Sequence, residues 1–450
     1  MTDAERDALD AAKAARLTWI ARLYSYDEEA ISDVVADEQL FDRRNDFGMQ
    51  HFLDSYRPLT KLRDKHGPLV FRVGAVEHEA SDVTLAELHA DLPDGGRVTF
   101  IQRVRFEAAL PCRVRYWSSY PPLPDGVRIR PYAPTDAPGC VALERLCPME
   151  SADGTRWVLD RGDRFDDYLQ LMAPTDAWVA EYAGDIVGFF SCALRPVTYQ
   201  DESCYAVYQH HYRVHPEHRA GSVSVALASH VDPRRTFDGL NVPFPYSLVD
   251  PDNVHMQHVG FPAVPDVRIA RLTLSLSALR APLASEDPEA QEIELDTPSV
   301  ASIIALMDAT HGERVLYPGV TAEALQARWS RVVDYNHASY RGTDDAFVGL
   351  WLAGERNLLE RAEQREERRL GFVLDYGARA PADLLATLRR AAVDIDPTLT
   401  HLALMCDTRA PEYALLEPFA DDVASLAIHT LPWIIADLQQ GAVYCDGAYC

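Results

Sequence analysis

The stretch Val214-His215-Pro216-Glu217-His218-Arg219-Ala220-Gly221-Ser222-Val223-Ser224-Val225-Ala226-Leu227 is the part of this sequence that decides the fold. It contains the end of a predicted strand, a proline, a turn with one arginine and small residues, and the apolar start of a predicted helix. Small residues let a backbone approach a ligand closely, and the first N–H groups of a helix lack partners within the helix. These groups also lie at the positive end of the helix dipole. The stretch therefore predicts a binding site for a diphosphate.

The predicted elements around this turn follow a definite order. Before it come a strand over 127–131, a helix over 141–146, strands over 177–182 and 186–191, and a strand over 204–214. After it come strands over 246–249 and 267–274. Alternating apolar residues and the turn Gly184-Asp185 support these strands. This order resembles the GNAT (GCN5-related N-acetyltransferase) superfamily, whose central signature is Arg/Gln-x-x-Gly-x-Gly/Ala before a helix.

The resemblance covers residues 126–275 and implies a mixed sheet flanked by helices, with acetyl-CoA or another acyl-CoA as cosubstrate. It also implies that the strand end offers backbone groups to the pantetheine arm and that the turn holds the diphosphate. The CoA-binding residues implied in this way are Tyr212, Arg213, Val214, Arg219, Ala220, Gly221, Ser222, Val223, Ser224 and, by a looser match, Asn253. Two of the family's glycines are replaced here by Ser222 and Ser224, whose hydroxyls can donate hydrogen bonds to a phosphate.

The strand before the turn carries candidate catalytic residues. Side chains alternate along a strand, so we expect Tyr208, His210 and Tyr212 to share one face and His211 to point to the other. Histidine titrates near neutrality, which suits the base that removes a proton from an attacking amine. The resemblance implies that His210 is this base or a substrate contact and that Tyr208 is a substrate contact. The alternative for His210 is a hydrogen-bonded, half-buried histidine in a sheet.

A departure from the family concerns the general acid. Many members have a tyrosine four residues before a Gly-Phe pair, where it protonates the leaving thiolate. This chain has Met256 at that position, before Gly260-Phe261. A methionine cannot transfer a proton, so Tyr246 or a water has to fill the role if the chain is a working acyltransferase.

The chain divides into three predicted domains. Residues 1–125 hold a helix over 4–24 and a β-rich run, and residues 126–278 form the GNAT-like domain. A proline-rich linker, Pro121-Pro122-Leu123-Pro124-Asp125-Gly126, separates them. Residues 290–450 repeat the same order of elements, but no Arg-x-x-Gly-x-Gly loop precedes the helix predicted from Pro381. The expected fold class is thus α+β or α/β, with GNAT-like mixed sheets in tandem, the second degenerate, and an N-terminal β-rich domain.

Composition limits the partners and the location of the protein. The net charge of −26 disfavours nucleic acid and anionic membranes, which require concentrated positive charge. The sequence contains no apolar run of about 20 residues and no signal-peptide core at its start, so we expect a cytoplasmic protein. Eight scattered cysteines do not form a disulfide framework. The pair His255 and His258 lacks a third ligand, and no metal is expected.

The function expected is N-acylation of a small amine or aminoacyl acceptor by direct attack on an acyl-CoA thioester. Decarboxylation of a malonyl-type thioester, transfer to a thiol or carrier protein, and a non-catalytic CoA-binding scaffold stay open as alternatives. Acidic residues on the acceptor side could attract a cationic amine or could be surface charges; they are Glu144, Glu150, Asp153, Asp160 and Asp163. An oligomer is possible.

Overall fold

The structure is a computed structural model that describes residues 3–25, 57–80, 82–107, 110–150, 155–219, 222–230, 244–251, 253, 262–281, 300–331, 345–361, 364–430 and 434–445. The chain forms two compact units. The first comprises Met1–Ile129 and Glu217–His230, and the second comprises Arg130–Pro216 and Val231–Cys450. No helix among the described residues is long and apolar enough to cross a membrane.

The first unit is a four-stranded antiparallel sheet with helices. Its strands are β1 (Arg72–His78), β2 (Val83–Asp91), β3 (Arg97–Glu107) and β4 (Leu110–Tyr120), in that order. Its helices are α1 (Asp3–Tyr24), α4 (Arg57–His66) and α7 (Val223–His230), the last of which packs on β4. The β2–β3 turn contains Gly95 with a φ of 86°, a conformation that glycine adopts without strain. The predicted N-terminal helix and β-rich run are therefore confirmed.

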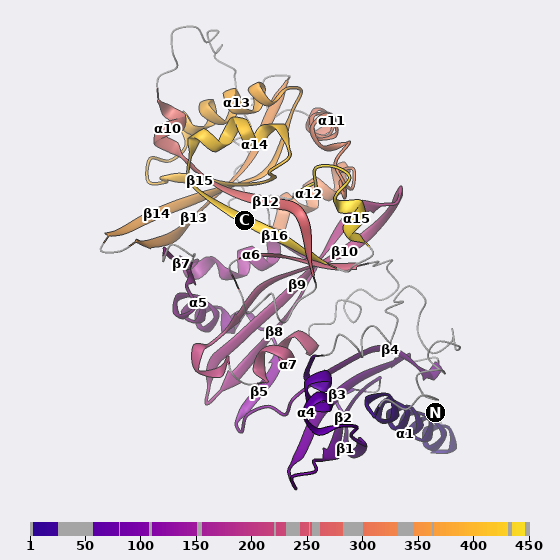
Figure 1. Ribbon diagram of the computed structural model, residues 1–450. Helices are drawn as coiled ribbons and strands as arrows, with labels where there is room; N and C mark the ends of the chain where they lie inside the picture. The colour runs from indigo at the N-terminus through magenta and orange to yellow at the C-terminus, as the bar shows by residue number, and fades with distance from the viewer. Residues whose placement is uncertain are drawn as a thin grey trace. The chain divides into compact units, whose positions relative to one another are not determined.

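The second unit contains one mixed sheet of twelve strands in its described part (Figure 1). The strand order is β5-β8-β9-β10-β11-β16-β12-β15-β14-β13-β7-β6. The strands are β5 (Val127–Pro131), β6 (Met149–Glu150), β7 (Arg156–Asp160), β8 (Thr175–Tyr182), β9 (Asp185–Tyr199), β10 (Glu202–Val214), β11 (Phe244–Val249), β12 (Ala263–Ser275), β13 (Ala346–Arg361), β14 (Gln364–Ala378), β15 (His401–Asp407) and β16 (Ala420–Thr430). Its α-helices are α5 (Ala137–Leu146), α6 (Phe165–Leu171), α10 (Leu276–Arg280), α11 (Val300–His311), α12 (Ala322–Arg331), α13 (Pro381–Asp394), α14 (Pro411–Leu416) and α15 (Ile435–Leu438).

The same pairing pattern occurs twice in this sheet. In the first half, β9 is antiparallel to β10, and β10 is parallel to β11. In the second half, β13 is antiparallel to β14, and β14 is parallel to β15. In the sequence, α7 lies between the parallel strands of the first half, and α13 lies between those of the second. This repeated order confirms the predicted tandem GNAT-like fold.

The last strand of each half pairs with the other half. The strand β12 pairs antiparallel with β15, whereas β16 pairs antiparallel with β11, from Tyr246↔Thr430 to Val249↔Ala427. The two exchanged strands also pair with each other near the middle of the sheet (Figure 1). The halves share one continuous sheet, so the proposed division at residues 278 and 290 stays a prediction. The strand predicted over 292–295 lies outside the described residues.

The two halves differ in the link between the middle strand of this pattern, β10 or β14, and the helix that follows it. In the second half only Arg379 and Ala380 separate β14 from α13. In the first half, eight residues from His215 to Ser222 separate β10 from α7. A two-residue turn leaves no loop to surround a diphosphate, in keeping with a degenerate second copy. Residues 360–361 and 364–369 of the charged run, which the sequence predicts to be a solvated helix or a hairpin tip, lie at the paired end of β13 and β14.

Candidate active site

The parallel strands β10 and β11 separate at the centre of the first half. Their pairing runs from Ala206↔Phe244 to Gln209↔Ser247, while β10 stays paired with β9 as far as Val214. The β9–β10 register shifts between His210 and Arg213, and His211 has a φ of 53°. This is a β-bulge with a non-glycine residue in the left-handed region, and such strain is concentrated at functional sites.

The bulge brings two histidine side chains together. The Nδ1 atoms of His210 and His211 lie 2.7 Å apart, and the Ser191 hydroxyl lies 3.2 Å from Nδ1 of His210. The His210 ring stacks on Tyr208 with centroids 5.3 Å apart and an interplanar angle of 12°, so these two residues share a face as predicted. The expectation that His211 points to the opposite face is wrong, because the bulge interrupts the alternation. The expectation that Tyr212 shares the Tyr208 face is wrong for the same reason. Tyr212 packs against Phe190, with ring centroids 4.8 Å apart.

Burial keeps both imidazoles neutral. Desolvation, with smaller contributions from the positive charges of Arg195 and Arg161, lowers the pKa of His210 to about 3. Desolvation and the Arg161 charge lower the pKa of His211 well below its usual value. His210 therefore does not titrate near neutrality as expected from its residue type, and its imidazole can accept or donate one hydrogen bond without a change of charge across physiological pH.

This neutral state predicts the pH profile of the acyl transfer that the sequence leads us to expect. A group with a folded pKa of about 3 is already deprotonated above pH 4, so kcat/KM should show no histidine limb between pH 5 and 8. His210→Gln should lower kcat/KM by about tenfold or more through lost positioning while the shape of the profile is unchanged. The measurement is kcat/KM against pH for both proteins. A limb near pH 6.5 that disappears in His210→Gln would contradict this expectation.

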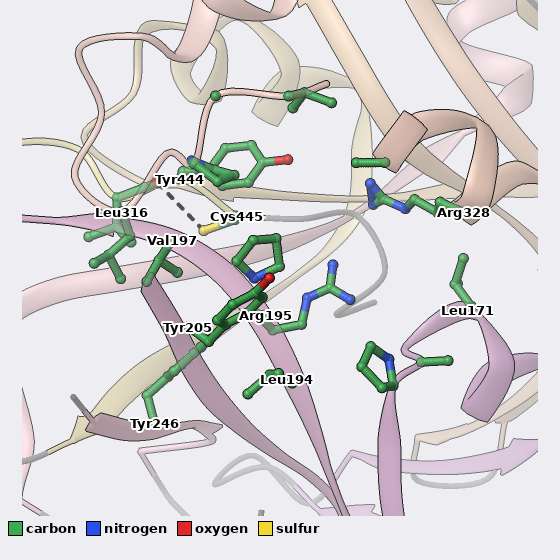
Figure 2. Close-up of a pocket in the computed structure, with 18 of the residues that line it drawn as sticks. Leu171, Leu194, Arg195, Val197, Tyr205, Tyr246, Leu316, Arg328, Tyr444 and Cys445 are labelled. Atoms are coloured by element: carbon green, nitrogen blue, oxygen red, sulfur yellow. Dashed lines mark hydrogen bonds between the residues drawn. The ribbon is translucent and has the colours of Figure 1, made fainter. Parts of the chain in front are cut away.

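A cavity of about 220 Å³ lies on the Tyr208 face of the sheet. Tyr246 lines this cavity, whereas Tyr208 and His210 do not. The ring centroid of Tyr246 lies 5.2 Å from that of Tyr208, which in turn stacks on His210. Strands β9, β10 and β11 supply one wall, and the end of α6, the 316–320 loop and α12 supply another. The segment 443–445 covers part of it, with Tyr444 and Cys445 over the sheet (Figure 2).

Arginines carry the charge of the cavity lining. Arg195 of β9 and Arg328 of α12 extend into the cavity from its two walls (Figure 2), and Arg331 also lines it. The Arg328 Nη1 lies 2.7 Å from Oδ1 of Asp375, a carboxylate with 0% exposure. No aspartate or glutamate is found among the described lining residues.

A buried ionic network lies in the same unit, beside the bulge. Arg161 forms ion pairs with Glu144 and Glu355, and its guanidinium lies 4.4 Å from the ring centroid of Tyr168. Desolvation raises the pKa of Glu144. Asp160 pairs with Arg145 and Arg356 at 2.6 and 2.9 Å.

The interpretation as surface charges is therefore wrong for two of the five acidic residues on the acceptor side. Glu144 is 4% exposed and Asp160 is 8% exposed, because both are held in ion pairs. Asp163 is exposed. The side chain of Glu150 and the whole of Asp153 lie outside the described residues.

The segment that covers the cavity is anchored by Asp407 at the end of β15. Its Oδ2 accepts hydrogen bonds from the backbone N–H of Val443 at 2.8 Å and from Nη2 of Arg409 at 2.7 Å. Its Oδ1 accepts the backbone N–H of Arg409 at 2.8 Å. One buried carboxylate thus fixes the position of the segment that carries Tyr444.

The predicted CoA-binding residues are divided between the two units. Tyr212, Arg213 and Val214 end β10 in the second unit, whereas Arg219 and Ser222 to Ser224 belong to the first. Arg219 is exposed, Ser224 is partly exposed and Val223 is buried. The Ser222 hydroxyl donates a hydrogen bond to the Pro122 carbonyl. Their binding roles stay predictions.

Other predicted residues fall partly outside the described chain. Asn253 is exposed, and its backbone N–H donates to the Asp250 carbonyl at 2.9 Å. Residues Ala220 and Gly221 of the turn, and His255, Met256 and His258, lie outside the described residues. Tyr246, considered as an alternative acid, lines the cavity.

Sequence reasoning missed Arg195, Arg328 and Tyr444. These residues come from β9, α12 and the 443–445 segment, so only the folded sheet brings them together. Arginine is abundant in this chain and no single one is distinctive. No local signal marked Arg195 either, because Arg195-Pro196 lies beyond the strand predicted over 186–191.

Comparisons with known proteins give structural similarities at low sequence identity. No protein-family model and no curated protein matches the chain. The chain is similar to Saccharomyces cerevisiae N-myristoyltransferase with bound myristoyl-CoA, with a TM-score of 0.47, 9% identity, and coverage of 69% of this chain and 84% of that one. It is similar to a probable N-acyltransferase from Enterococcus faecalis, with a TM-score of 0.35, 11% identity and coverage of 68% and 71%. It is also similar to a GCN5-related N-acetyltransferase from Kribbella flavida, with a TM-score of 0.35, 15% identity and coverage of 69% and 73%.

Proposed function

We propose that this protein is an acyl-CoA-dependent N-acyltransferase acting on a small amine or aminoacyl acceptor. The observation that carries the proposal is the parallel β10–β11 pair, which separates at a strained bulge on the sheet face that also holds the cavity. Where the two strands separate, their backbone N–H and C=O groups no longer pair with each other. A thioester and its pantetheine arm can form hydrogen bonds with these groups instead. The long turn between β10 and α7 carries the predicted diphosphate site.

The proposed reaction is direct attack. The neutral amine forms a bond to the thioester carbonyl carbon, the carbonyl oxygen becomes an oxyanion held by backbone N–H groups, and the C–S bond then breaks. The amine proton passes to water, and the CoA thiolate takes a proton from Tyr246 or water. Because the pKa of His210 is about 3, we assign this imidazole to positioning the acceptor or its water rather than to holding the proton.

The proposal is tested by following CoA thiol release from acetyl-CoA and longer acyl-CoAs with and without amine acceptors. We expect release only when an acceptor is present. Release of carbon dioxide from malonyl-CoA without an acceptor would instead indicate a decarboxylase. No turnover with any acceptor, despite CoA binding, would indicate a scaffold.

A second prediction concerns the diphosphate. Arg219→Ala should weaken CoA binding by about tenfold, because an arginine pairs with two phosphate oxygens through charge-assisted hydrogen bonds. Isothermal calorimetry with CoA and with dephosphorylated pantetheine measures this loss, which should appear only for CoA. Arg97→Ala is the matched control, since the Arg97 side chain is 58% exposed and pairs with Asp91. Equal CoA affinity in both variants would remove the turn from the site.

A further inference from the structure

The cavity wall is mainly apolar. Its β-strand side includes Leu194, Val197 and Phe244, and its opposite side includes Leu171 and Leu325. A wall of this kind favours a ligand whose body is aliphatic or aromatic, because apolar surface is removed from water on binding. The volume of about 220 Å³ lies below the 300–1,000 Å³ usual for drug-sized ligands. The space therefore suits a molecule the size of a single amino acid.

The charged groups of the same wall all have one sign. Arg195, Arg328 and Arg331 line the cavity, and the described lining includes no carboxylate. A guanidinium group carries a positive charge and five N–H donors. Asp375 lies behind the wall and pairs with Arg328. The described lining of the cavity is complementary to an anion.

Arg195 is the arginine placed to link such an anion to the reaction site. It is 7% exposed and comes from the strand that faces β10, where it pairs with Ala206. Its charge adds to the effect of burial in lowering the pKa of His210. The same charge opposes burial at Tyr444, where burial raises the pKa. A group bound to Arg195 thus lies within electrostatic reach of the bulge histidine and of the covering segment.

We infer that the acceptor is an amphipathic carboxylate, of the class of apolar α-amino acids, whose carboxylate binds Arg195 and whose side chain occupies the apolar wall. This rests on the proposed acyl transfer. A planar guanidinium matches a carboxylate with two parallel hydrogen bonds, which fixes orientation as well as charge. In an α-amino acid, one carbon separates the carboxylate from the amine, so the nucleophile stays near the same end of the cavity. A purely cationic amine would meet three arginines there.

The test compares four probes on the wild-type protein: L-phenylalanine, L-phenylalaninamide, 2-phenylethylamine and 3-phenylpropionate. Binding is measured by calorimetry, without any thioester. We expect the two carboxylates to bind at least tenfold more tightly than the amide and the amine. Arg195→Leu should abolish this preference, and Arg195→Lys should keep part of it. Arg379→Leu is the matched control, because the Arg379 side chain is 69% exposed and does not line the cavity.

Thiol release from acetyl-CoA with the same probes separates this inference from the proposed function. Turnover with 2-phenylethylamine and none with phenylalanine, together with weak carboxylate binding, overturns the inference and leaves acyl transfer standing. Carboxylate binding that requires Arg195, without any thiol release, supports the anion site while acyl transfer fails. Carboxylate binding that Arg195→Leu leaves unchanged overturns the assignment. The four-probe comparison needs no variant, so it holds even if Arg195→Leu does not fold.

Discussion

Replacing Asp407 with alanine is expected to destabilise the second unit by about 3–5 kcal/mol. The carboxylate is 0% exposed and accepts hydrogen bonds from the Arg409 side chain and from the backbone N–H groups of Arg409 and Val443. The variant leaves these donors without their acceptor, and each buried donor left in this way costs free energy. The carboxylate thus holds two parts of the chain, the turn at Arg409 and the 443–445 segment that covers the cavity.

Urea denaturation with a fluorescence probe measures the loss as a shift of the midpoint at constant slope. Asp421→Ala is the matched control: the carboxylate of Asp421 is 49% exposed and lies 3.0 Å from His401, so its removal should cost less than about 1 kcal/mol. Equal losses in the two variants would show that Asp407 does not anchor the segment. At temperatures where Asp407→Ala stays folded, we also expect weaker ligand binding in the cavity.

Trp351→Ala should be about as costly, at about 3–5 kcal/mol. This side chain is 0% exposed, with its ring centroid 4.6 Å from that of Tyr168 and 5.6 Å from that of Phe372. Trp351 lies on β13 of the second half, whereas Tyr168 lies on α6 of the first. Truncation would leave a void at the packing between the halves, and the surrounding side chains would lose contacts.

Trp351→Phe is the graded control. It keeps one aromatic ring in the space that the indole fills, so we expect a loss well below that of the alanine variant. Val393→Ala, at a position 67% exposed, should be close to neutral. Thermal unfolding of the three variants tests the ranking. A phenylalanine variant as unstable as the alanine variant would contradict the expectation that the loss follows the ring volume removed.

The fold was predictable from the sequence because its signals are local. Alternating runs such as 127–131 and 267–274, and turns such as Gly184-Asp185, specify elements from neighbouring residues. The repeated order of these elements predicted the tandem arrangement. The exchange of β12 and β16 between the halves was not predictable in this way. It depends on which strand edges meet in the folded sheet, and no local pattern encodes that choice.

The site was predictable only in part, for the same reason. Tyr208 and His210 could be proposed from the sequence because they lie on one strand beside the signature turn, and their roles stay predictions. The neutral state of His210 depends on burial by distant elements and on Arg195 and Arg161, so the residue type alone gave the wrong titration range. The bulge that turns His211 toward His210 inserts one residue into a regular alternation, and the sequence around it carries no glycine to mark it.

The strand exchange has a consequence for synthesis of the chain. The open edge of β11 is covered by β16, which pairs with it up to Thr430, so the first half lacks its neighbouring strand until residue 430 has been synthesised. A shortened product would keep a bare strand edge, and bare edges promote aggregation. We therefore expect chains truncated before residue 430 to be insoluble, and the sheet face that holds the cavity to form late in folding.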